Sequence, residues 1–206
     1  FDGEQTRFIF RNYAIKKMIS VQGLSGTGKT ELLLHKLKEL YINDDETTIF
    51  FTCHNIALAD KLRQRIPRFF DFMMVNKQIK WNERLWMSRA WGSKNNPNTG
   101  LYSYLCNYYN LPFCRYSPGV DYQVIFSNVL EAINAIPPKK FKPCLDYILV
   151  DESQDFPEVF FEVCKKVVRQ KVYMAGDVFQ DIFDSVKKKK WGVDIVLNRC
   201  YRTDPR

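Results

Sequence analysis

Residues 23–30 read "GLSGTGKT". It fills the pattern G-x-x-x-x-G-K-[ST], in which backbone N–H groups surround phosphates, the lysine reaches the β and γ oxygens, and the hydroxyl meets Mg²⁺. The apolar run "MISVQG" (18–23) precedes it, and "KTELLLHKLKELY" (29–41) follows with leucines at helical spacing. A strand, a glycine loop and a helix in this order predict a phosphate site, because a helix N-terminus presents unpaired N–H donors.

The residues that this pattern assigns to phosphate binding are Gly23, Ser25, Gly26, Thr27, Gly28, Lys29 and Thr30. A loop of this kind serves kinases, GTPases, transporters and motors alike, so the rest of the chain has to decide between them. GTPases commonly read guanine with N-K-x-D, and the nearest match, "NKQI" (76–79), has Ile79 in place of the aspartate. The base is therefore not expected to be read as guanine in that way.

Composition sets the outer bounds. The 206 residues, 46% of them hydrophobic, suit one α/β domain with an insertion, or one domain of a larger protein. No apolar stretch is long enough to span a bilayer, and the N-terminus lacks the layout of a signal peptide. Six scattered cysteines without a C-x-x-C pair indicate a reduced, cytoplasmic protein, nucleoid-associated if bacterial. The net charge of +8 suits a polyanionic partner without requiring one.

A second informative stretch is "LDYILVDESQDFP" (145–157). Its apolar centre predicts a buried parallel strand, and Asp151 and Glu152 stand at the carboxyl end, where open α/β sheets place their ligands. We expect Asp151 to hold Mg²⁺ and Glu152 to polarise the water that attacks the γ-phosphate. The adjacent pair argues for hydrolysis by water rather than for transfer to a second substrate.

Two further segments add polar groups to the same site. "KVYMAGDVFQDIF" (171–183) again reads as a strand, followed by Gln180, which is placed to sense the γ-phosphate or its attacking water. "LNRCYRTDPR" (197–206) offers Tyr201 to stack on a base and Arg202 to pair with phosphate charge. Each of these residues alone is weak evidence, whereas their order and spacing are specific.

The series resembles the first RecA-like domain of a superfamily 1 DNA helicase of the UvrD/Rep/PcrA type. The segments that carry the resemblance, in the order of the family's motifs Q, I, Ia, Ib, II, III and IV, are "DGEQ" (2–5), "GLSGTGKT" (23–30), "FFTCHNIALADKL" (50–62), "MSRAWGS" (87–93), "VDESQD" (150–155), "GDVFQDIF" (176–183) and "NRCYRT" (198–203). Motifs I, II, III and IV together make the match specific, and the matches run through nearly the whole chain.

The resemblance implies roles for individual residues. Gln5 would select adenine and Tyr201 would stack on it. Glu152 would act as the general base, Gln180 as the γ-phosphate sensor, and Arg202 would face the γ-phosphate.

It further implies a nucleic-acid path and metal ligands. Thr52, Asn55, Trp91 and Phe183 would contact a single strand, with Thr30 and Asp151 holding Mg²⁺. At the position of the motif III tryptophan the chain has Ser185, so Phe183 is the aromatic that remains.

The middle of the chain is the least readable part. Residues 68–145 hold three tryptophans, 81, 86 and 91, and the resemblance predicts a mainly helical insertion there. These rings are expected mostly to form the core of the insertion, with a single-strand platform as the alternative. The run "KKKK" (187–190) is either a solvated face or a phosphate contact.

The sequence therefore predicts an α/β P-loop (RecA-like) fold, with a mostly parallel sheet, helices on both faces and a helical insertion. Residues 1–67 and 146–206 would form the ATP-binding domain and 68–145 the insertion, with strands near 18–22, 47–52, 146–151, 171–176 and 194–197.

The predicted function is that of an ATP- and Mg²⁺-dependent helicase domain that translocates on single-stranded DNA, RNA not being excluded, and unwinds duplex. The alternatives are a regulatory or nuclease-associated, defence-type ATPase module and, less favoured, a P-loop phosphotransferase. The chain reads as a monomeric fragment with no membrane partner. It would hydrolyse ATP weakly without the second RecA-like domain of its parent.

Overall fold

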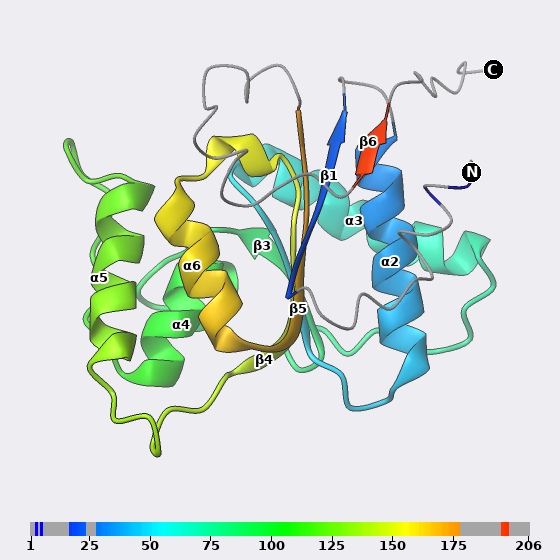
Figure 1. Cartoon of the computed structure of the whole chain (residues 1–206). Helices are drawn as coiled ribbons and strands as arrows, with labels where there is room; N and C mark the ends of the chain where they lie inside the picture. The colour runs from blue at the N-terminus through cyan, green and yellow to red at the C-terminus, as the bar shows by residue number, and fades with distance from the viewer. Residues whose placement is uncertain (1–2, 4, 6–16, 24–27, 178–194, 198–206) are drawn as a thin grey trace.

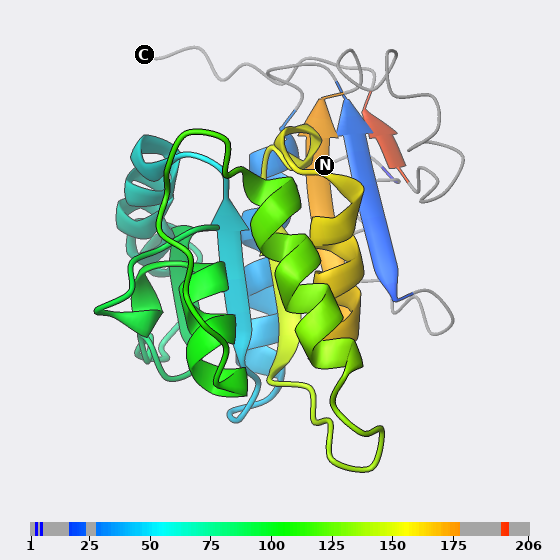
Figure 2. The ribbon, with the colours of Figure 1, turned by 90° about the vertical axis from the view of Figure 1, so that its left-hand side faces the viewer.

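Short runs of apolar residues form one sheet in the computed structural model, which describes residues 3, 5, 17–23, 28–177 and 195–197 (Figure 1). The strands of this part of the chain are β1 (Met18–Gly23), β2 (Ile49–Cys53), β3 (Leu85–Arg89), β4 (Leu145–Val150), β5 (Val168–Asp177) and β6 (Ile195–Leu197). Their order across the sheet is β3-β2-β4-β5-β1-β6. Every pairing is parallel, so all carboxyl ends lie along one edge, as the arrowheads in Figure 2 show.

Helices cover both faces of the sheet. Helices α2 (Lys29–Asn43) and α3 (Ile56–Phe72) pack on one face, and α6 (Glu158–Val167), with α4 (Leu101–Tyr109) and α5 (Tyr122–Asn134), on the other. Two short 3₁₀ helices are η1 (Pro97–Thr99) and η2 (Ser153–Asp155). Among the described residues, no helix combines the length and the apolar character needed to cross a bilayer.

Strand β2 shows why the sheet is buried on both sides. Successive side chains of a strand point to opposite faces. Phe50 therefore packs with α4, α5 and α6, while Ile49 and Phe51 pack with α2 and α3. All three are fully buried, and burying one such side chain contributes about 1.5–3 kcal/mol. This double burial explains the apolar runs without alternation that mark the strands in the sequence.

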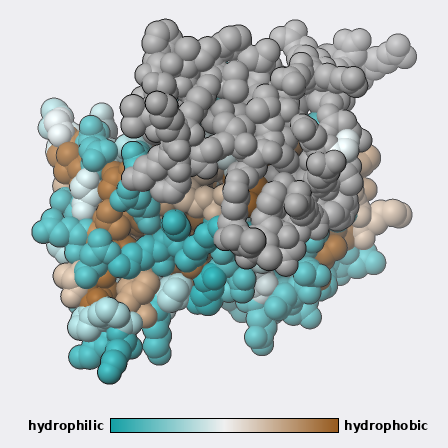
Figure 3. Space-filling view, viewed as in Figure 1, coloured by the Kyte–Doolittle hydropathy of each residue, from teal (hydrophilic) through white to brown (hydrophobic). Residues whose placement is uncertain are grey.

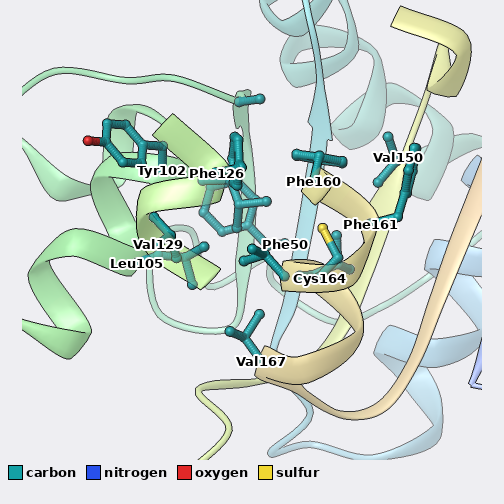
Figure 4. Close-up of a cluster of buried hydrophobic side chains, with 14 of the residues drawn as sticks. Phe50, Tyr102, Leu105, Phe126, Val129, Val150, Phe160, Phe161, Cys164 and Val167 are labelled. Atoms are coloured by element: carbon teal, nitrogen blue, oxygen red, sulfur yellow. The ribbon is translucent and has the colours of Figure 1, made fainter. Parts of the chain in front are cut away.

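Aromatic rings fill the core on the side of α4–α6. Figure 4 shows Phe50, Phe126 and Phe160 converging from a strand and two helices. The Phe126 and Phe160 rings meet edge to face at 4.8 Å between centroids, and Phe156 stacks on Phe160 at 4.0 Å. Because Phe156 follows η2 directly, this packing fixes the segment that carries the acidic pair to the body of the fold.

The predicted fold class is confirmed, and each of the five predicted strands corresponds to an observed one. Strand β3 was missed. Its sequence, "LWMSR", lies in the interval predicted as a helical insertion, yet it pairs with β2 at the edge of the sheet. Trp86, next to the equally apolar Leu85 and Met87, stacks on Phe50 with the two rings 5° from parallel.

The interval 68–145 also contributes α4 and α5. Their side chains, among them Tyr102 and Phe126, share one hydrophobic cluster with the sheet and α6. The interval therefore packs into the same core as the sheet, and the predicted domain boundaries stay a prediction. On the face seen in Figure 3, hydrophilic residues dominate the lower part of the described surface, and hydrophobic residues appear in small areas between them.

Candidate active site

The end of motif I lies at the start of α2. Gly28 has φ 87° and ψ 20°, a left-handed backbone that glycine adopts without steric cost, and no side chain caps the helix. Lys29 and Thr30 then open the helix, and Lys29 is only 7% exposed. Gly23 ends β1, whereas Ser25, Gly26 and Thr27 lie outside the described residues.

Thr30 and Asp151, both predicted to hold Mg²⁺, contact each other directly. The Thr30 hydroxyl donates to Asp151 Oδ2 at 2.8 Å, and the backbone N–H of Glu152 donates to Oδ1 at 2.9 Å. Asp151 is 1% exposed, and burial raises the pKa of its carboxyl to about 6, although the hydrogen bond from Thr30 opposes this shift. A hydroxyl and a carboxylate are hard oxygen ligands that suit Mg²⁺, and a cation there would offset the cost of the buried charge.

Glu152 has an unusual backbone. Its φ of 50° and ψ of 50° place a non-glycine residue in the left-handed region, which costs about 1–2 kcal/mol. Its Oε2 accepts a hydrogen bond from Gln154 Nε2 at 2.5 Å. The acidic pair therefore divides: Asp151 faces Thr30, and Glu152 turns toward η2.

Gln154 reaches the neighbouring strand as well. Its Oε1 accepts from the backbone N–H of Asp177 at 2.9 Å, at the end of β5. The close approach requires Gly176, because a Cβ there would stand 2.3 Å from Ser153 Oγ and 2.9 Å from Gln154 Oε1. No role was predicted for Gln154, although its place two residues after the glutamate was visible in the sequence.

Of the other residues predicted to contact the nucleotide, the structure describes one. Gln5, predicted to select adenine, is 2% exposed. The residues Gln180, Phe183, Tyr201 and Arg202 lie outside the described residues, so their predicted roles stay predictions.

Two of the residues predicted to contact nucleic acid, Thr52 and Trp91, are buried. Thr52 is fully buried in β2, and its Oγ1 has no hydrogen-bond partner among the described residues. Its carbonyl accepts from Asp151 N at 3.0 Å. Trp91 is 8% exposed, packs edge to face against Tyr102, and donates from Nε1 to the Cys114 carbonyl at 3.1 Å. The Thr52 side chain is therefore enclosed in the sheet. Trp91, which was predicted to be the exception among the insertion's core rings, also packs mostly inside the core, and both nucleic-acid roles stay predictions.

Asn55 is exposed and stabilises the start of a helix. It is the N-cap of α3, and its Oδ1 accepts from Leu58 N at 3.1 Å. Capping by asparagine is common at helix N-termini, so the "TCHN" sequence is explained in part by the start of a helix.

A cleft of ≈ 930 Å³ opens beyond the carboxyl ends of β2 and β3. Its wall includes His54, Arg89, Trp91, Lys94, Arg115 and Tyr116. Lys94 and Arg115 are exposed and Tyr116 is 79% exposed, beside the buried Trp91 ring at 5.4 Å. Basic side chains and an exposed ring on one wall suit a nucleic-acid strand. In the sequence, basic residues stand close to aromatic ones in "RAWGSK" (89–94) and "CRY" (114–116), and this pattern could have predicted the wall of the cleft.

One wall of the cleft is preformed. Gly92 has φ 86°, and a Cβ on Gly100 would lie 2.3 Å from the Gly92 backbone nitrogen, so the two ends of this loop touch. Across the loop, Ser93 N donates to Thr99 Oγ1 at 2.8 Å. The loop that carries Lys94 is therefore closed by backbone contacts at its base.

Comparison with known proteins supports the same fold. The chain resembles a DUF1998 helicase, MrfA, in a crystal structure bound to DNA, with 12% identity and a TM-score of 0.53, over 97% of this chain and 27% of that one. It also resembles the large terminase of a thermophilic bacteriophage, with 13% identity and a TM-score of 0.53, over 96% of this chain and 45% of that one. The chain thus spans less than half the length of either protein.

None of the curated proteins matches the chain. The model of the family described as type III restriction enzyme, res subunit, matches residues 7–174, which is most of the chain. The chain belongs to this family and is a P-loop ATPase domain of the helicase type.

Proposed function

We propose that this chain is the first motor domain of an ATP-dependent helicase, in which ATP hydrolysis drives movement along a single nucleic-acid strand. The contact between Thr30 Oγ1 and Asp151 Oδ2 carries the proposal. It joins the start of α2 to the end of β4, and Glu152 follows directly after Asp151, one of the two proposed ligands of Mg²⁺. This arrangement suits hydrolysis of a phosphoanhydride by water.

The proposed roles follow from placement. Lys29 would pair with the β- and γ-phosphates, and Thr30 and Asp151 would hold Mg²⁺. Bound Mg²⁺ would neutralise phosphate charge as the terminal bond breaks. Glu152 would take a proton from the attacking water, and Gln5 would select adenine.

The remaining proposed roles fall on residues beyond the described part. Gln180 and Arg202 would respond to the γ-phosphate, with Tyr201 stacked on the base. These roles rest on the order of the motifs in the sequence.

The cleft beyond β2 and β3 is the proposed path of the strand. Arg89, Lys94 and Arg115 would contact phosphates, and Tyr116 would offer an exposed ring for a base. The DNA bound to the similar helicase MrfA supports a nucleic-acid partner. A steep loss of affinity with added salt would accompany contacts of this kind.

The finer assignment, to a superfamily 1 helicase of the UvrD/Rep/PcrA type, rests on the order of motifs from residue 2 to residue 203. In such a motor the second RecA-like domain of the parent would close over the ATP. The share of the similar proteins that this chain covers, 27% and 45%, agrees with a longer parent.

A second candidate function has one specific observation in its favour. The matching family is described as the res subunit of a type III restriction enzyme, which favours a nuclease-associated, defence-type ATPase. Such a module would hydrolyse ATP on DNA without extended unwinding.

The test uses the full-length parent protein. Its ATP turnover is measured with and without single-stranded DNA, and displacement of a labelled strand from a partial duplex is measured under the same conditions. Turnover stimulated by the strand together with displacement supports the helicase, whereas stimulation without displacement supports the second candidate. Glu152→Gln should keep ATP affinity and lose turnover. Unchanged turnover in that variant would remove Glu152 as the base.

A further inference from the structure

Gln154 connects two parts of the proposed active site that belong to different strands. Its amide nitrogen donates to Glu152 Oε2 at 2.5 Å, and its amide oxygen accepts from Asp177 N at 2.9 Å. Glu152 follows β4 and Asp177 ends β5, so one side chain spans the carboxyl ends of adjacent strands.

The backbone fixes which way the amide faces. A backbone N–H can only donate, so the group that faces Asp177 N must be the amide oxygen. The amino group then faces Glu152, where it requires an acceptor. A carboxylate provides one, and the pairing leaves Oε1 of Glu152 without a bond to Gln154.

The approach of η2 to β5 is possible because residue 176 is glycine. A Cβ on Gly176 would collide with Ser153 Oγ at 2.3 Å and crowd Gln154 Oε1 at 2.9 Å. Phe156, stacked on Phe160, anchors the far end of η2. Gln154 is thus held between the stacked Phe156 and Phe160 rings on one side and the backbone of Gly176, which has no side chain, on the other.

We propose that Gln154 is a positioning residue for Glu152, which rests on the proposed function of Glu152 as the general base. By holding Oε2, Gln154 leaves Oε1 to accept a proton from water. The water oxygen then bonds to the γ-phosphorus, the bond to the β–γ bridging oxygen breaks, and ADP and phosphate leave. A displacement of a base by about 1 Å can cost on the order of 100-fold in rate, so the bridge matters for turnover.

The bridge also ties the base to the segment beyond β5. The proposed sensor Gln180 lies three residues after Asp177 in the sequence. A shift at the end of β5 would move the Asp177 N–H away from the Gln154 amide oxygen that it orients. The orientation of the Glu152 carboxylate therefore depends on the position of that strand end.

The test compares three substitutions in the full-length protein. Gln154→Met keeps the length of the side chain and removes both hydrogen bonds. Gln154→Glu keeps an acceptor for Asp177 N but replaces the donor to Glu152 with a like charge. Gln123→Met is the matched control, because Gln123 is exposed on α5 and bonds only Ser127 Oγ at 3.3 Å among the described residues.

We expect Gln154→Met to lower kcat for ATP roughly 10- to 100-fold, with KM and the affinity for a non-hydrolysable ATP analogue unchanged within about twofold. Gln154→Glu should lose turnover at neutral pH and regain part of it at acid pH, where the introduced carboxyl is protonated and can donate. Gln123→Met should retain normal turnover. Analogue affinity also shows that each variant is folded.

A double-mutant cycle separates positioning from packing. In the Glu152→Gln background, Gln154→Met should cause little further loss in single-turnover hydrolysis, because the group it orients is gone. An equal loss in both backgrounds would overturn the proposal and leave Gln154 a packing residue. Normal kcat in Gln154→Met, with Glu152→Gln inactive, would also overturn it. Normal turnover in Glu152→Gln would instead overturn the proposed function itself.

Discussion

The Thr30 hydroxyl and the Asp151 carboxylate lie 2.8 Å apart although 121 positions separate the two residues in the chain. The contact forms because β1 and β4 are parallel strands of one sheet, and both deliver their following residues to the same edge. It leaves Asp151 with a hydrogen bond to each carboxylate oxygen, which a residue only 1% exposed requires.

Replacing Thr30 by Val should destabilise the protein and weaken Mg²⁺-dependent nucleotide binding. The change keeps the branched shape but leaves Asp151 Oδ2 buried without its donor, at a cost of about 1–3 kcal/mol. Urea unfolding without nucleotide measures the first effect, and titration with an ATP analogue with and without Mg²⁺ measures the second. Thr30→Ser, which retains the hydroxyl, is the control. If both variants bind the nucleotide equally well, the hydroxyl is not a metal ligand.

The same substitution at Thr52 should have the opposite effect on stability. Its Oγ1 is buried without a partner among the described residues, so Thr52→Val removes a desolvated hydroxyl and should raise the free energy of unfolding by about 1 kcal/mol. Single-stranded DNA binding should not change, because the side chain is fully buried. A loss of DNA affinity in Thr52→Val would instead support the strand contact that the resemblance implies for Thr52.

The basic wall of the cleft should govern how DNA binding depends on salt. Removing Lys94 and Arg115 together, as Lys94→Ser and Arg115→Ser, should reduce the slope of log affinity against log salt by about 1.4, which is about 0.7 for each lost phosphate contact on a single strand. Lys139→Ser with Lys140→Ser removes the same charge from an exposed loop before β4, at the opposite edge of the sheet, and should leave the slope unchanged. Equal slopes in both double variants would exclude the cleft as the strand's path.

Two stretches of sequence were enough to predict which residues would form the candidate nucleotide site. The run 23–30, with the apolar run 18–23 before it and the helical pattern 29–41 after it, predicts a strand, a loop and a helix, and the N-terminus of such a helix presents backbone donors to a phosphate. Asp151 was predictable for a similar reason, since a carboxylate directly after an apolar run stands at the ligand edge of a parallel sheet. At these residues the local sequence pattern and the position in the folded sheet lead to the same prediction.

Other features depend on packing that no local pattern reports. Strand β3 was hidden because its tryptophan suggested the core of an insertion, and only pairing with β2 identifies it as a strand. The burial of Thr52 could not be read from its polar side chain. The role of Gln154 depends on Gly176, which lies 22 positions further along the chain and meets it only in the folded protein.

Asp146 should make the stability of the fold sensitive to acid. It bonds Thr48 N at 2.9 Å and Arg169 Nε at 2.7 Å, and so ties together β4, the residue before β2, and β5. Burial pushes the pKa of Asp146 up, but the hydrogen bonds from Arg169 and Thr48 together hold it below its usual value. Asp146→Asn should therefore cost about 1–2 kcal/mol at neutral pH, a modest figure because Arg169 is partly exposed.

The pH dependence of that cost identifies its origin. Because the pKa of Asp146 is lower in the folded chain than in the unfolded one, its stabilisation is complete above the ordinary value of 3.8 and is lost as pH falls through the folded value. The difference in unfolding free energy between the native protein and Asp146→Asn should thus be constant from pH 7 to pH 5 and shrink below about pH 4. Asp45→Asn is the control, since the Asp45 side chain is 81% exposed and its ion pair with Lys77 should contribute little. A difference that persists unchanged into acid would mean that the Asp146 charge is not what stabilises this corner of the sheet.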